Sequence, residues 1–261
     1  MKSKQIEAGS IDRNALLDYL DEYLEASRGE DYCPNGLQVE GKKSIRRIVL
    51  GVSACLELFE RAAASDTDAI LVHHGLLWKG DTRRITGLQH GRIATLIRSD
   101  MNLIAYHLPL DRHPEVGNNA VAASALGLGE VEPFGVYEGL SIGFKGVLPS
   151  ATPVAEIETR CKAIFEQPPL MFDFGPDLVR SVGIISGAAS RSLHDAIHEG
   201  LDMFITGEPS EWTMNVAREA RCHFVAAGHY ATERLGIKAL GAHLETKFGL
   251  EVEFIDVPNP I

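Results

Sequence analysis

Apolar residues near the start of the chain recur with the spacing of an amphipathic helix. The apolar positions that share one helical face, at i, i+4, i+7 and i+8, are Leu16, Leu20, Tyr23 and Leu24. This pattern, with a period of about 3.6 residues, predicts a helix from Arg13 to about Ser27. Asp12 precedes this segment and is a candidate N-cap residue.

Beyond this helix, short β-rich or fully apolar runs alternate with helical runs. A Pro34-Asn35-Gly36 turn opens the series. The expected strands cover 37–40, 48–52, 69–72 and 103–106, and the expected helices cover 56–64 and 92–98. Alternation of this kind favours an α/β fold with a mostly parallel sheet.

The second half of the chain repeats this order of elements. With a shift of 134 residues, Asp68 falls on Asp202 and the apolar run 69–72 falls on 203–206. Past the next loop the shift becomes 122, so that His107 falls on His229 and the first half carries an insertion within 76–90. A duplication is therefore predicted, although any α/β chain resembles itself to some degree. The expected repeats are 1–129 and 130–261, with halves that intertwine into discontinuous domains.

Composition and charge narrow the class of protein. The chain has 261 residues, of which 45% are hydrophobic and 23% charged, as in ordinary globular proteins. The net charge of −11 disfavours nucleic acid as a partner. The longest apolar runs are too short to span a bilayer, and the polar N-terminus lacks the core of a signal peptide. Four cysteines without a Cys-x-x-Cys pair indicate reduced thiols and a cytoplasmic location.

Candidate metal ligands follow three expected strands. They lie in the stretches Val72-His73-His74-Gly75, Tyr106-His107-Leu108-Pro109-Leu110-Asp111 and Gly228-His229-Tyr230-Ala231-Thr232-Glu233. Ligands of open α/β sheets bind at the carboxyl ends of strands, which favours a convergent site. A single histidine at a strand end is more often a packed residue, and adjacent histidines on a regular strand point to opposite faces.

The spacing within these stretches makes further predictions. His229 and Glu233 are four residues apart and share one face of a helix that begins near Tyr230. Pro109 is expected to prevent the same helix in the first half and to leave Asp111 on a loop. Imidazole and carboxylate donors without thiolate suit Zn, Fe, Mn, Co or Ni.

The number of donors favours two metal ions. Three histidines and two carboxylates exceed the three protein ligands of an open single-metal site. They fit two ions about 3.5–4 Å apart, bridged by a carboxylate and a water. Such a bridge produces hydroxide at neutral pH, so metal-assisted hydrolysis through a bridging hydroxide is the leading hypothesis.

The chain resembles the NIF-three-like family, also described as dinuclear-metal-centre hexameric proteins, in its short bacterial form. Bacterial members are often named GTP cyclohydrolase 1 type 2 homologues. The matching stretches are 31–41 (DYCPNGLQVEG), 73–80 (HHGLLWKG), 107–111 (HLPLD), 117–119 (GNN), 205–208 (ITGE), 228–233 (GHYATE) and 254–259 (FIDVPN). They extend from near residue 31 almost to the C-terminus.

The resemblance implies an α/β fold of two intertwined repeats with mixed, mostly parallel sheets, assembled as a toroidal homohexamer. It implies two divalent metal ions per chain, held at the positions of His73, His74, Asp111, His229 and Glu233. Glu233 is the expected bridging ligand. His107 and Glu208 are expected beside these ligands, as orienting groups or proton shuttles, or else as a cap or a buried hydrogen-bonding residue. Candidate substrate-lining residues, with turn or packing roles as the alternative, are Asn35, Trp78 and Asn118.

The resemblance therefore implies a metal-dependent hydrolase of a small molecule, such as a purine nucleotide opened in a GTP cyclohydrolase-like reaction. No Gly-x-x-x-x-Gly-Lys-Ser/Thr loop is present, so phosphates would have to bind scattered cations such as Lys79, Arg83 and Arg84. A non-enzymatic metal-binding or metal-delivery protein, or a regulatory interaction protein, remains the alternative.

Overall fold

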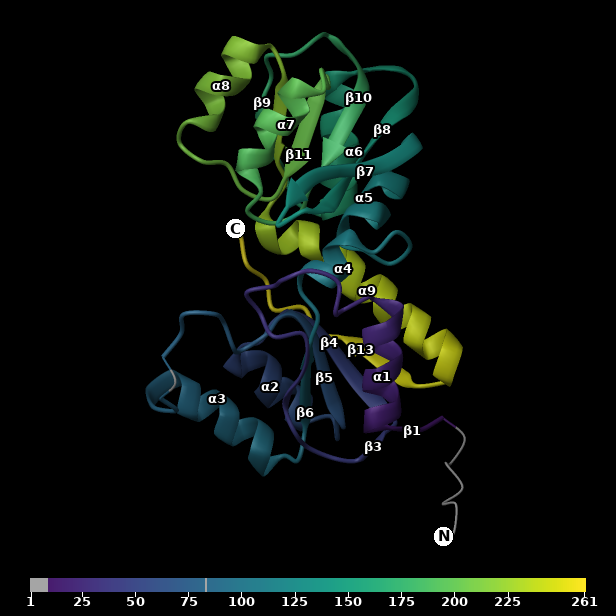
Figure 1. Cartoon of the computed structure of the whole chain (residues 1–261), viewed down its shortest axis with the longest axis vertical. Helices are drawn as coiled ribbons and strands as arrows, with labels where there is room; N and C mark the ends of the chain where they lie inside the picture. Colours follow the sequence, from purple (N-terminus) through teal and green to yellow (C-terminus); the bar gives the residue numbers. More distant parts are fainter. Residues whose placement is uncertain (1–8, 83) are drawn as a thin grey trace. The chain divides into compact units, whose positions relative to one another are not determined.

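The computed structural model describes residues 9–82 and 84–261. The chain forms two compact units (Figure 1). Unit 1 comprises Met1–Leu110 and Ile237–Val257, and unit 2 comprises Asp111–Gly236 and Pro258–Ile261. Neither unit is one continuous segment. The repeat boundary at residues 129 and 130 concerns order along the chain and stays a prediction.

Unit 1 is built on a sheet in which most neighbours are parallel. Its order is β13 (Glu251–Phe254), β4 (Arg47–Ser53), β5 (Ala69–His74), β6 (Asn102–Ala105) and β2 (Gly36–Val39). Only β2 runs antiparallel to its neighbour β6. A separate antiparallel pair joins β1 (Ile11–Asp12) to β3 (Ser44–Ile45). The central strands are apolar on both faces, as a sheet covered by helices on both sides requires.

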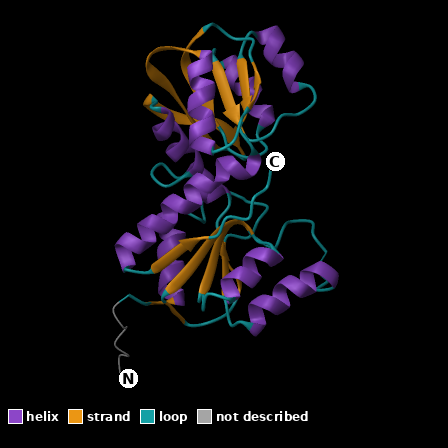
Figure 2. Ribbon diagram, turned by 180° about the vertical axis from the view of Figure 1, so that it is seen from behind, coloured by secondary structure: helices purple, strands orange, loops and turns teal. Residues whose placement is uncertain are grey.

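Four helical segments cover this sheet. They are α1 (Arg13–Tyr23), α2 (Leu56–Ala63), α3 (Gly87–Arg98) and the part of α9 (His229–Phe248) from Ile237 onward. Helices α2 and α3 lie on one face, and α1 and α9 lie on the other (Figure 1, Figure 2). Asp12 accepts hydrogen bonds from the backbone N–H groups of Asn14 and Ala15, which confirms the predicted cap. The helix ends at Tyr23, before Ser27, and Glu25 then adopts a φ of 49°.

Unit 2 contains a sheet whose parallel strands lie in its middle. Its order is β7 (Gly129–Tyr137), β8 (Leu140–Pro153), β10 (Leu178–Ile184), β11 (Met203–Thr206), β12 (His223–Ala226) and β9 (Leu170–Phe172). Strands β10, β11 and β12 are parallel, whereas β7, β8 and β9 pair antiparallel with their neighbours. The fold is therefore α/β with mixed sheets, as predicted, and parallel pairing predominates only in unit 1.

Helices cover both faces of this second sheet. They are α5 (Asn118–Leu126), α6 (Val154–Phe165), η1 (Ser190–Ser192), α7 (Leu193–His198), α8 (Thr213–Ala220) and the start of α9. The short helix α4 (Leu108–Arg112) contains the point at which the chain passes from unit 1 to unit 2. The alternation of strand β11 shows the two layers: Met203 and Ile205 pack with α5 and α6, while Phe204 packs with α7 and α8. In the described part of the chain, no helix has the length and apolar content needed to cross a membrane.

The two central sheets repeat the same local contacts. Oδ2 of Asp68 accepts hydrogen bonds from the N–H groups of Arg46 and Arg47, each at 2.9 Å. Asp202 accepts the equivalent bonds from Arg180 and Ser181, at 2.8 and 2.9 Å. All of these positions differ by the predicted shift of 134 residues, so the repeated segments have the same backbone geometry.

The predicted shift of 122 residues is wrong by one residue in the third strand. Asn102 lies opposite Ala69, and His223 lies opposite Met203, so the strand register requires a shift of 121. His107 and His229, which the shift of 122 pairs, lie beyond these strands, so the strand register does not test that pairing. The sequence comparison placed the gap in a loop, whereas hydrogen bonding within the sheet sets the true alignment.

Candidate metal centre

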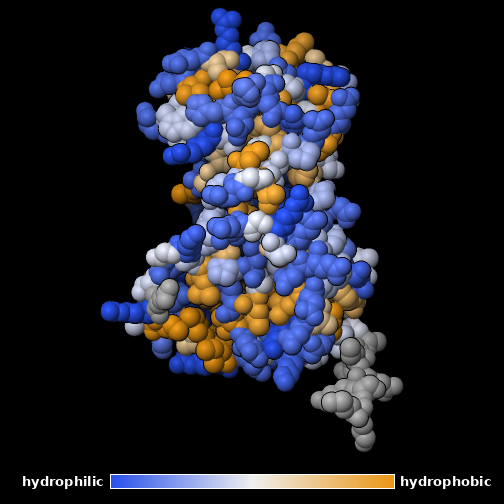
Figure 3. Space-filling view, viewed as in Figure 1, coloured by the Kyte–Doolittle hydropathy of each residue, from blue (hydrophilic) through white to orange (hydrophobic). Residues whose placement is uncertain are grey.

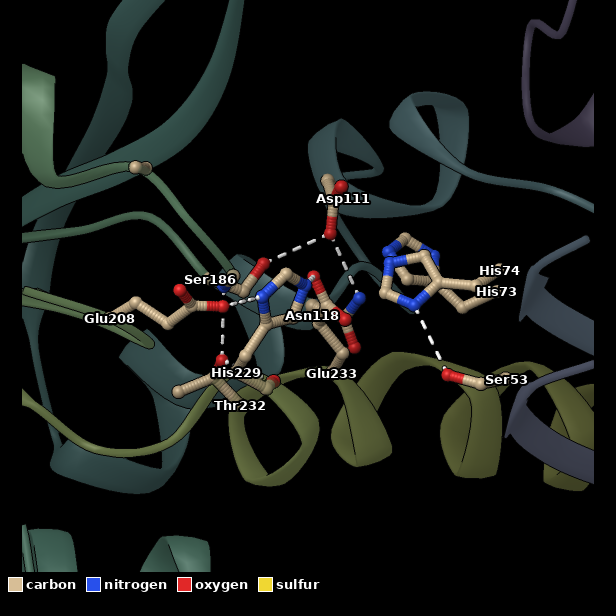
Figure 4. A network of polar contacts seen from close by, with 12 residues as sticks. Ser53, His73, His74, Asp111, Asn118, Ser186, Glu208, His229, Thr232 and Glu233 are labelled. Atoms are coloured by element: carbon tan, nitrogen blue, oxygen red, sulfur yellow. Dashed lines mark hydrogen bonds and ion pairs between the residues drawn. The ribbon is translucent and has the colours of Figure 1, made fainter. Parts of the chain in front are cut away.

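Strand β5 ends in two histidines whose rings lie side by side (Figure 4). The ring centroids of His73 and His74 are 4.7 Å apart, with the ring planes tilted by 42°. His73 is buried, and its Nδ1–H donates to the carbonyl oxygen of Tyr106 at 3.1 Å. His74 is half-buried, with Nδ1 3.3 Å from the hydroxyl of Ser53. At the end of β5, the side chains of two adjacent residues therefore lie close together and do not point to opposite faces of the sheet.

His107 joins these two histidines within unit 1. It follows strand β6 and is buried, and its Nδ1–H donates to the carboxylate of Asp31 at 2.8 Å. Ligand atoms of His73, His74 and His107 all lie within 4.8 Å of one another. Unit 1 by itself therefore brings together three imidazoles that are close enough to serve one metal ion after small movements.

Asp31 is held by several hydrogen bonds. Its carboxylate accepts hydrogen bonds from the N–H groups of Cys33 and Leu108 and from the side-chain amide of Asn35. Burial alone would raise the pKa of Asp31, but its hydrogen bond with His107 and the charge of that ring outweigh burial and lower the pKa. Asp31 was not predicted as a site residue; its position four residues before Asn35, in the stretch 31–41, was the available signal.

Asn35 positions its neighbours. Its side-chain oxygen accepts a hydrogen bond from the backbone N–H of His107 at 2.8 Å, while its amide group bonds Asp31. Asn35 therefore links the two members of the Asp31–His107 pair. Its predicted contact with a substrate stays a prediction.

Aromatic rings border the histidines of unit 1. Trp78 packs with its ring centroid 5.7 Å from His74 and 5.3 Å from His107, and its indole N–H donates to Gly75. Tyr32, which was not predicted as a site residue, stands edge-on to His107, with the ring centroids 4.9 Å apart. The loop that carries Trp78 also contains Arg83, a candidate phosphate contact that lies outside the described residues.

In unit 2, Asp111 lies on a helix, so its expected position on a loop is wrong. Helix α4 contains Pro109 in its first turn, where a missing N–H costs nothing because first-turn N–H groups have no partner within the helix. Oδ1 of Asp111 accepts hydrogen bonds from Asn118 and from the hydroxyl of Ser186, both at 2.9 Å (Figure 4). Ser186 was not predicted from the sequence.

Asn118 is fully buried and joins three parts of unit 2. Its amide group donates to Asp111, and its side-chain oxygen accepts a hydrogen bond from Gly236 N–H at 2.7 Å. These contacts make Asn118 a positioning residue for the Asp111 carboxylate. Its predicted role in lining a substrate site stays a prediction.

The start of helix α9 places an imidazole between two carboxylates (Figure 4). The helix begins at His229, and Nε2 of His229 lies 3.2 Å from Oε1 of Glu233, one turn later. Nδ1 of His229 donates to Glu208. Burial alone would lower the pKa of His229, but hydrogen bonds to Glu233 and Glu208 and their charges outweigh it and raise the pKa to about 9. The two carboxylates of Glu208 and Glu233 therefore favour a positive charge at this position.

A glycine lets the neighbouring loop lie against this group. A Cβ atom at Gly187 would lie 2.4 Å from Oε1 of Glu233 and 3.2 Å from Nε2 of His229. Thr232 fixes this loop by accepting a hydrogen bond from Gly187 N–H at 3.1 Å. The imidazole nitrogen of His229 beside carboxylate oxygens is a donor set that fits a divalent cation. The described residues of each unit therefore carry a group that suits such an ion.

Fold and side-chain groups together define an α/β protein with buried histidine–carboxylate clusters suited to divalent metals. The model of the Duf34/NIF3 (NGG1p interacting factor 3) family matches residues 11–260, and the chain belongs to this family.

Relatives and solved structures agree with this assignment. Proteins named GTP cyclohydrolase 1 type 2 homolog from Pseudomonas aeruginosa and Escherichia coli K12 are each 43% identical to this chain. The matches cover 96% and 95% of this chain and 99% of each relative. The structure of a protein called ybgI, of unknown function, has a TM-score of 0.91 at 41% identity and covers 96% of this chain and 100% of its own. Reduced HcgD from Methanocaldococcus jannaschii shares the fold, with a TM-score of 0.84 at 21% identity over 96% of this chain and 100% of its own.

Proposed function

We propose that the protein binds two divalent metal ions and uses them to hydrolyse a small molecule. The proposed ligands are those that the sequence resemblance implies: His73, His74, Asp111, His229 and Glu233. The observation that carries the proposal is the pair of half-buried His229 and buried Glu233, whose Nε2 and Oε1 atoms lie 3.2 Å apart, with Glu208 at Nδ1 of the same ring. The names of the relatives support a purine nucleotide such as GTP as the substrate class.

The residues around the ligands have distinct tasks in this proposal. A bound divalent ion supplies Lewis acidity and lowers the pKa of water. Glu208 orients the ring of His229, while Ser186 and Asn118 fix one oxygen of Asp111. Hydrogen bonds of this type set the direction and basicity of a metal ligand. Trp78, with its half-buried ring, provides a flat apolar surface for a heterocycle.

Metal content and turnover test the proposal together. Protein purified without chelators is expected to contain close to two transition-metal ions per chain, and metal-loaded protein is expected to hydrolyse at least one purine nucleotide. Glu233→Gln should lose both properties. Full metal retention by this variant contradicts the ligand assignment, and a metal-loaded protein that hydrolyses none of a nucleotide panel contradicts the activity.

A second candidate is metal binding without catalysis, in a delivery or regulatory protein. The family description names an interacting factor, which favours this alternative. Exchange of bound metal with a chelator separates the two functions, because a delivery protein must release its ion readily whereas an enzyme retains it. Loss of most bound metal within minutes, with no turnover, would favour delivery.

We also propose a cytoplasmic homo-oligomer, with a hexamer as the expected state. Apolar side chains gather over α2 and α3 in unit 1 (Figure 3). Leu88 is 81% exposed and Ile97 is 62% exposed, values that are unusual for large aliphatic residues. Light scattering of wild type and Leu88→Lys tests whether this surface supports the assembly. A wild-type monomer contradicts the proposal.

A further inference from the structure

A fully buried asparagine and a fully buried histidine occupy equivalent places in the two central sheets. Asn102 begins β6 in unit 1 and His223 begins β12 in unit 2, and the strand register makes them equivalent. The backbone N–H of each donates to the carbonyl oxygen of the aspartate before the neighbouring strand, Asp68 or Asp202. The two units therefore place different side chains in one local backbone geometry.

In unit 1, the asparagine ties β6 to the short segment between β2 and β3. Oδ1 of Asn102 accepts a hydrogen bond from Gly41 N–H at 2.9 Å. Its amide group donates to the carbonyl oxygens of Lys42 and Asp68, at 2.9 and 3.0 Å. An amide side chain keeps the same donors and acceptors at every ordinary pH. This link is therefore independent of pH.

In unit 2, the histidine makes the equivalent contacts with the segment 173–177, which joins β9 to β10. Nδ1 of His223 accepts a hydrogen bond from Gly175 N–H at 3.2 Å, and Nε2–H donates to the carbonyl oxygen of Pro176 at 2.8 Å. Gly175 and Pro176 lie 134 positions after Gly41 and Lys42. Acceptance at Nδ1 together with donation at Nε2 requires the neutral form of the ring.

A carboxylate lies beside the same ring nitrogen. Oδ1 of Asp173 is 3.0 Å from Nδ1 of His223, in a pair whose side chains are 60% and 0% exposed, respectively. The neutral ring presents only a lone pair at Nδ1, so Asp173 has no proton to accept there. A proton at Nδ1 reverses both contacts, because Gly175 N–H loses its acceptor and Asp173 gains a donor.

Other ionisable side chains near this place are engaged with different groups. The carboxylate of Asp202, just before β11, accepts hydrogen bonds from two backbone N–H groups of β10. Burial raises the pKa of the Cys222 thiol to about 12, so this neighbour stays uncharged. The guanidinium of Arg218 on α8 lies over an aromatic ring of the segment 173–177, 4.8 Å from its centroid. Within residues 9–82 and 84–261, Asp173 is therefore the partner for a protonated His223.

We propose that His223 is a pH-sensitive switch in unit 2, whose Nδ1 exchanges Gly175 N–H for the carboxylate of Asp173 when the ring takes up a proton from water. Histidine is the side chain that ordinarily changes its charge between about pH 5 and pH 8. Protonation releases Gly175 and rearranges the segment 173–177, whereas the Asn102 link of unit 1 stays closed. The switch is independent of the proposed metal binding and hydrolysis.

Amide hydrogen exchange of Gly175 tests the switch between about pH 5 and pH 8. After correction for the intrinsic pH dependence of exchange, the protection of Gly175 should fall about 5–10-fold at the acid end, because one hydrogen bond is lost. Gly41 is the control within the same molecule, since its bond to Asn102 does not titrate. Its protection should stay constant over this range.

Three variants assign the effect to individual side chains. His223→Asn copies the residue of unit 1, so the protection of Gly175 should no longer depend on pH. Asp173→Asn removes the carboxylate that receives the proton, so the loss of protection should require a lower pH. Asp177→Asn, at an exposed position of the same segment, is the matched control and should behave as wild type.

Nitrogen-15 NMR of the His223 ring gives a readout that needs no variant. Nδ1 should appear as an unprotonated nitrogen at the alkaline end and as an N–H at the acid end. This measurement decides the question even where His223→Asn does not fold. An Nδ1 that stays unprotonated throughout, or a pH dependence of Gly175 protection that His223→Asn retains, would overturn the switch.

Discussion

The two units carry similar central sheets but different groups of potential metal ligands. In unit 1, three imidazoles gather at strand ends, and the carboxylate of Asp31 is engaged with His107. In unit 2, one imidazole lies between two carboxylates at the start of a helix. Imidazole sites suit zinc, iron or nickel, whereas carboxylates also suit manganese and magnesium. A repeated scaffold can therefore present two donor sets with different metal preferences.

The difference arises just after the third parallel strand of each unit. In unit 1 the chain enters the short helix α4, which contains Pro109, while in unit 2 it enters the 20-residue helix α9. A long helix places His229 and Glu233 on neighbouring turns of one face. The corresponding sheet edges therefore carry histidines at strand ends in unit 1, and a His-x-x-x-Glu pair on a helix in unit 2.

The largest expected effect concerns the carboxylate of unit 2. Glu233→Gln should lower the affinity for the ion held by unit 2 more than about 100-fold, since it removes a charged oxygen donor beside His229. Competition with a chromophoric chelator measures the affinity. Glu219→Gln, on the exposed face of α8, is the control. Equal metal affinities of Glu233→Gln and Glu219→Gln would mean that the carboxylate of Glu233 does not distinguish the donor group of unit 2 from that of unit 1.

A methyl group at Gly187 should disturb the same group by steric contact. Gly187→Ala places a Cβ 2.4 Å from Oε1 of Glu233, so this carboxylate must move, and metal affinity should fall about 10-fold or more. Gly200→Ala controls for backbone strain, because φ is +70° at Gly200 and +67° at Gly187, while nothing lies within 4 Å of a Cβ at Gly200. Both variants should lose about 1 kcal/mol of stability, but only Gly187→Ala should lose metal.

The repeated aspartates allow the sheets themselves to be compared. Asp68→Asn should reduce the free energy of unfolding by about 1.5–3 kcal/mol, because Asp68 accepts two backbone hydrogen bonds and pairs with Lys42 at 2.8 Å. Asp202→Asn removes the equivalent backbone contacts in unit 2. Urea denaturation of both variants measures the two contributions. A change near zero for both would show that these shared bonds do not stabilise either sheet.

The contribution of Asp68 should also depend on pH. Burial alone would raise the pKa of Asp68, but the Lys42 hydrogen bond and the N–H groups of Arg47 and Arg46 outweigh burial and lower the pKa. A carboxyl group with a lowered folded pKa stabilises the protein fully above its unfolded value of about 3.9 and loses that effect as the pH falls through the folded value. The difference between wild type and Asp68→Asn should therefore be complete near neutral pH and shrink below about pH 4.

The smallest expected effect concerns helix capping. Asp12→Ala should cost about 1 kcal/mol, because the Asp12 side chain accepts hydrogen bonds from two N–H groups at the start of α1. Helix α5 of unit 2 begins after Gly117, without a side-chain cap. Gly117→Ala should consequently change stability less than Asp12→Ala in thermal unfolding. The reverse order would show that the side-chain cap contributes little to unit 1.

Local pattern predicted much of unit 1 because its strands are short apolar runs and its helices are amphipathic. The expected strand 69–72 is part of β5, and the expected helix 56–64 is α2, which ends one residue earlier.

The hairpin of β7 and β8 was not predicted. Its turn uses Glu138 and Gly139, both with positive φ, and Glu138 is not a typical turn signal. Both strands also depend on pairing with each other and with β10.

The sequence by itself determined the α/β class, the repeated Asp68 and Asp202 positions, and the histidines at strand ends. These features depend on residue spacing and on short-range hydrogen bonding, which a linear pattern records. Only the folded structure shows that Asp31 bonds His107, that Ser186 bonds Asp111, and that Gly187 lies against the Glu233 carboxylate. Each of these contacts joins residues between 46 and 76 positions apart. Such contacts depend on how the chain returns to the same sheet edge, and no local periodicity encodes that path.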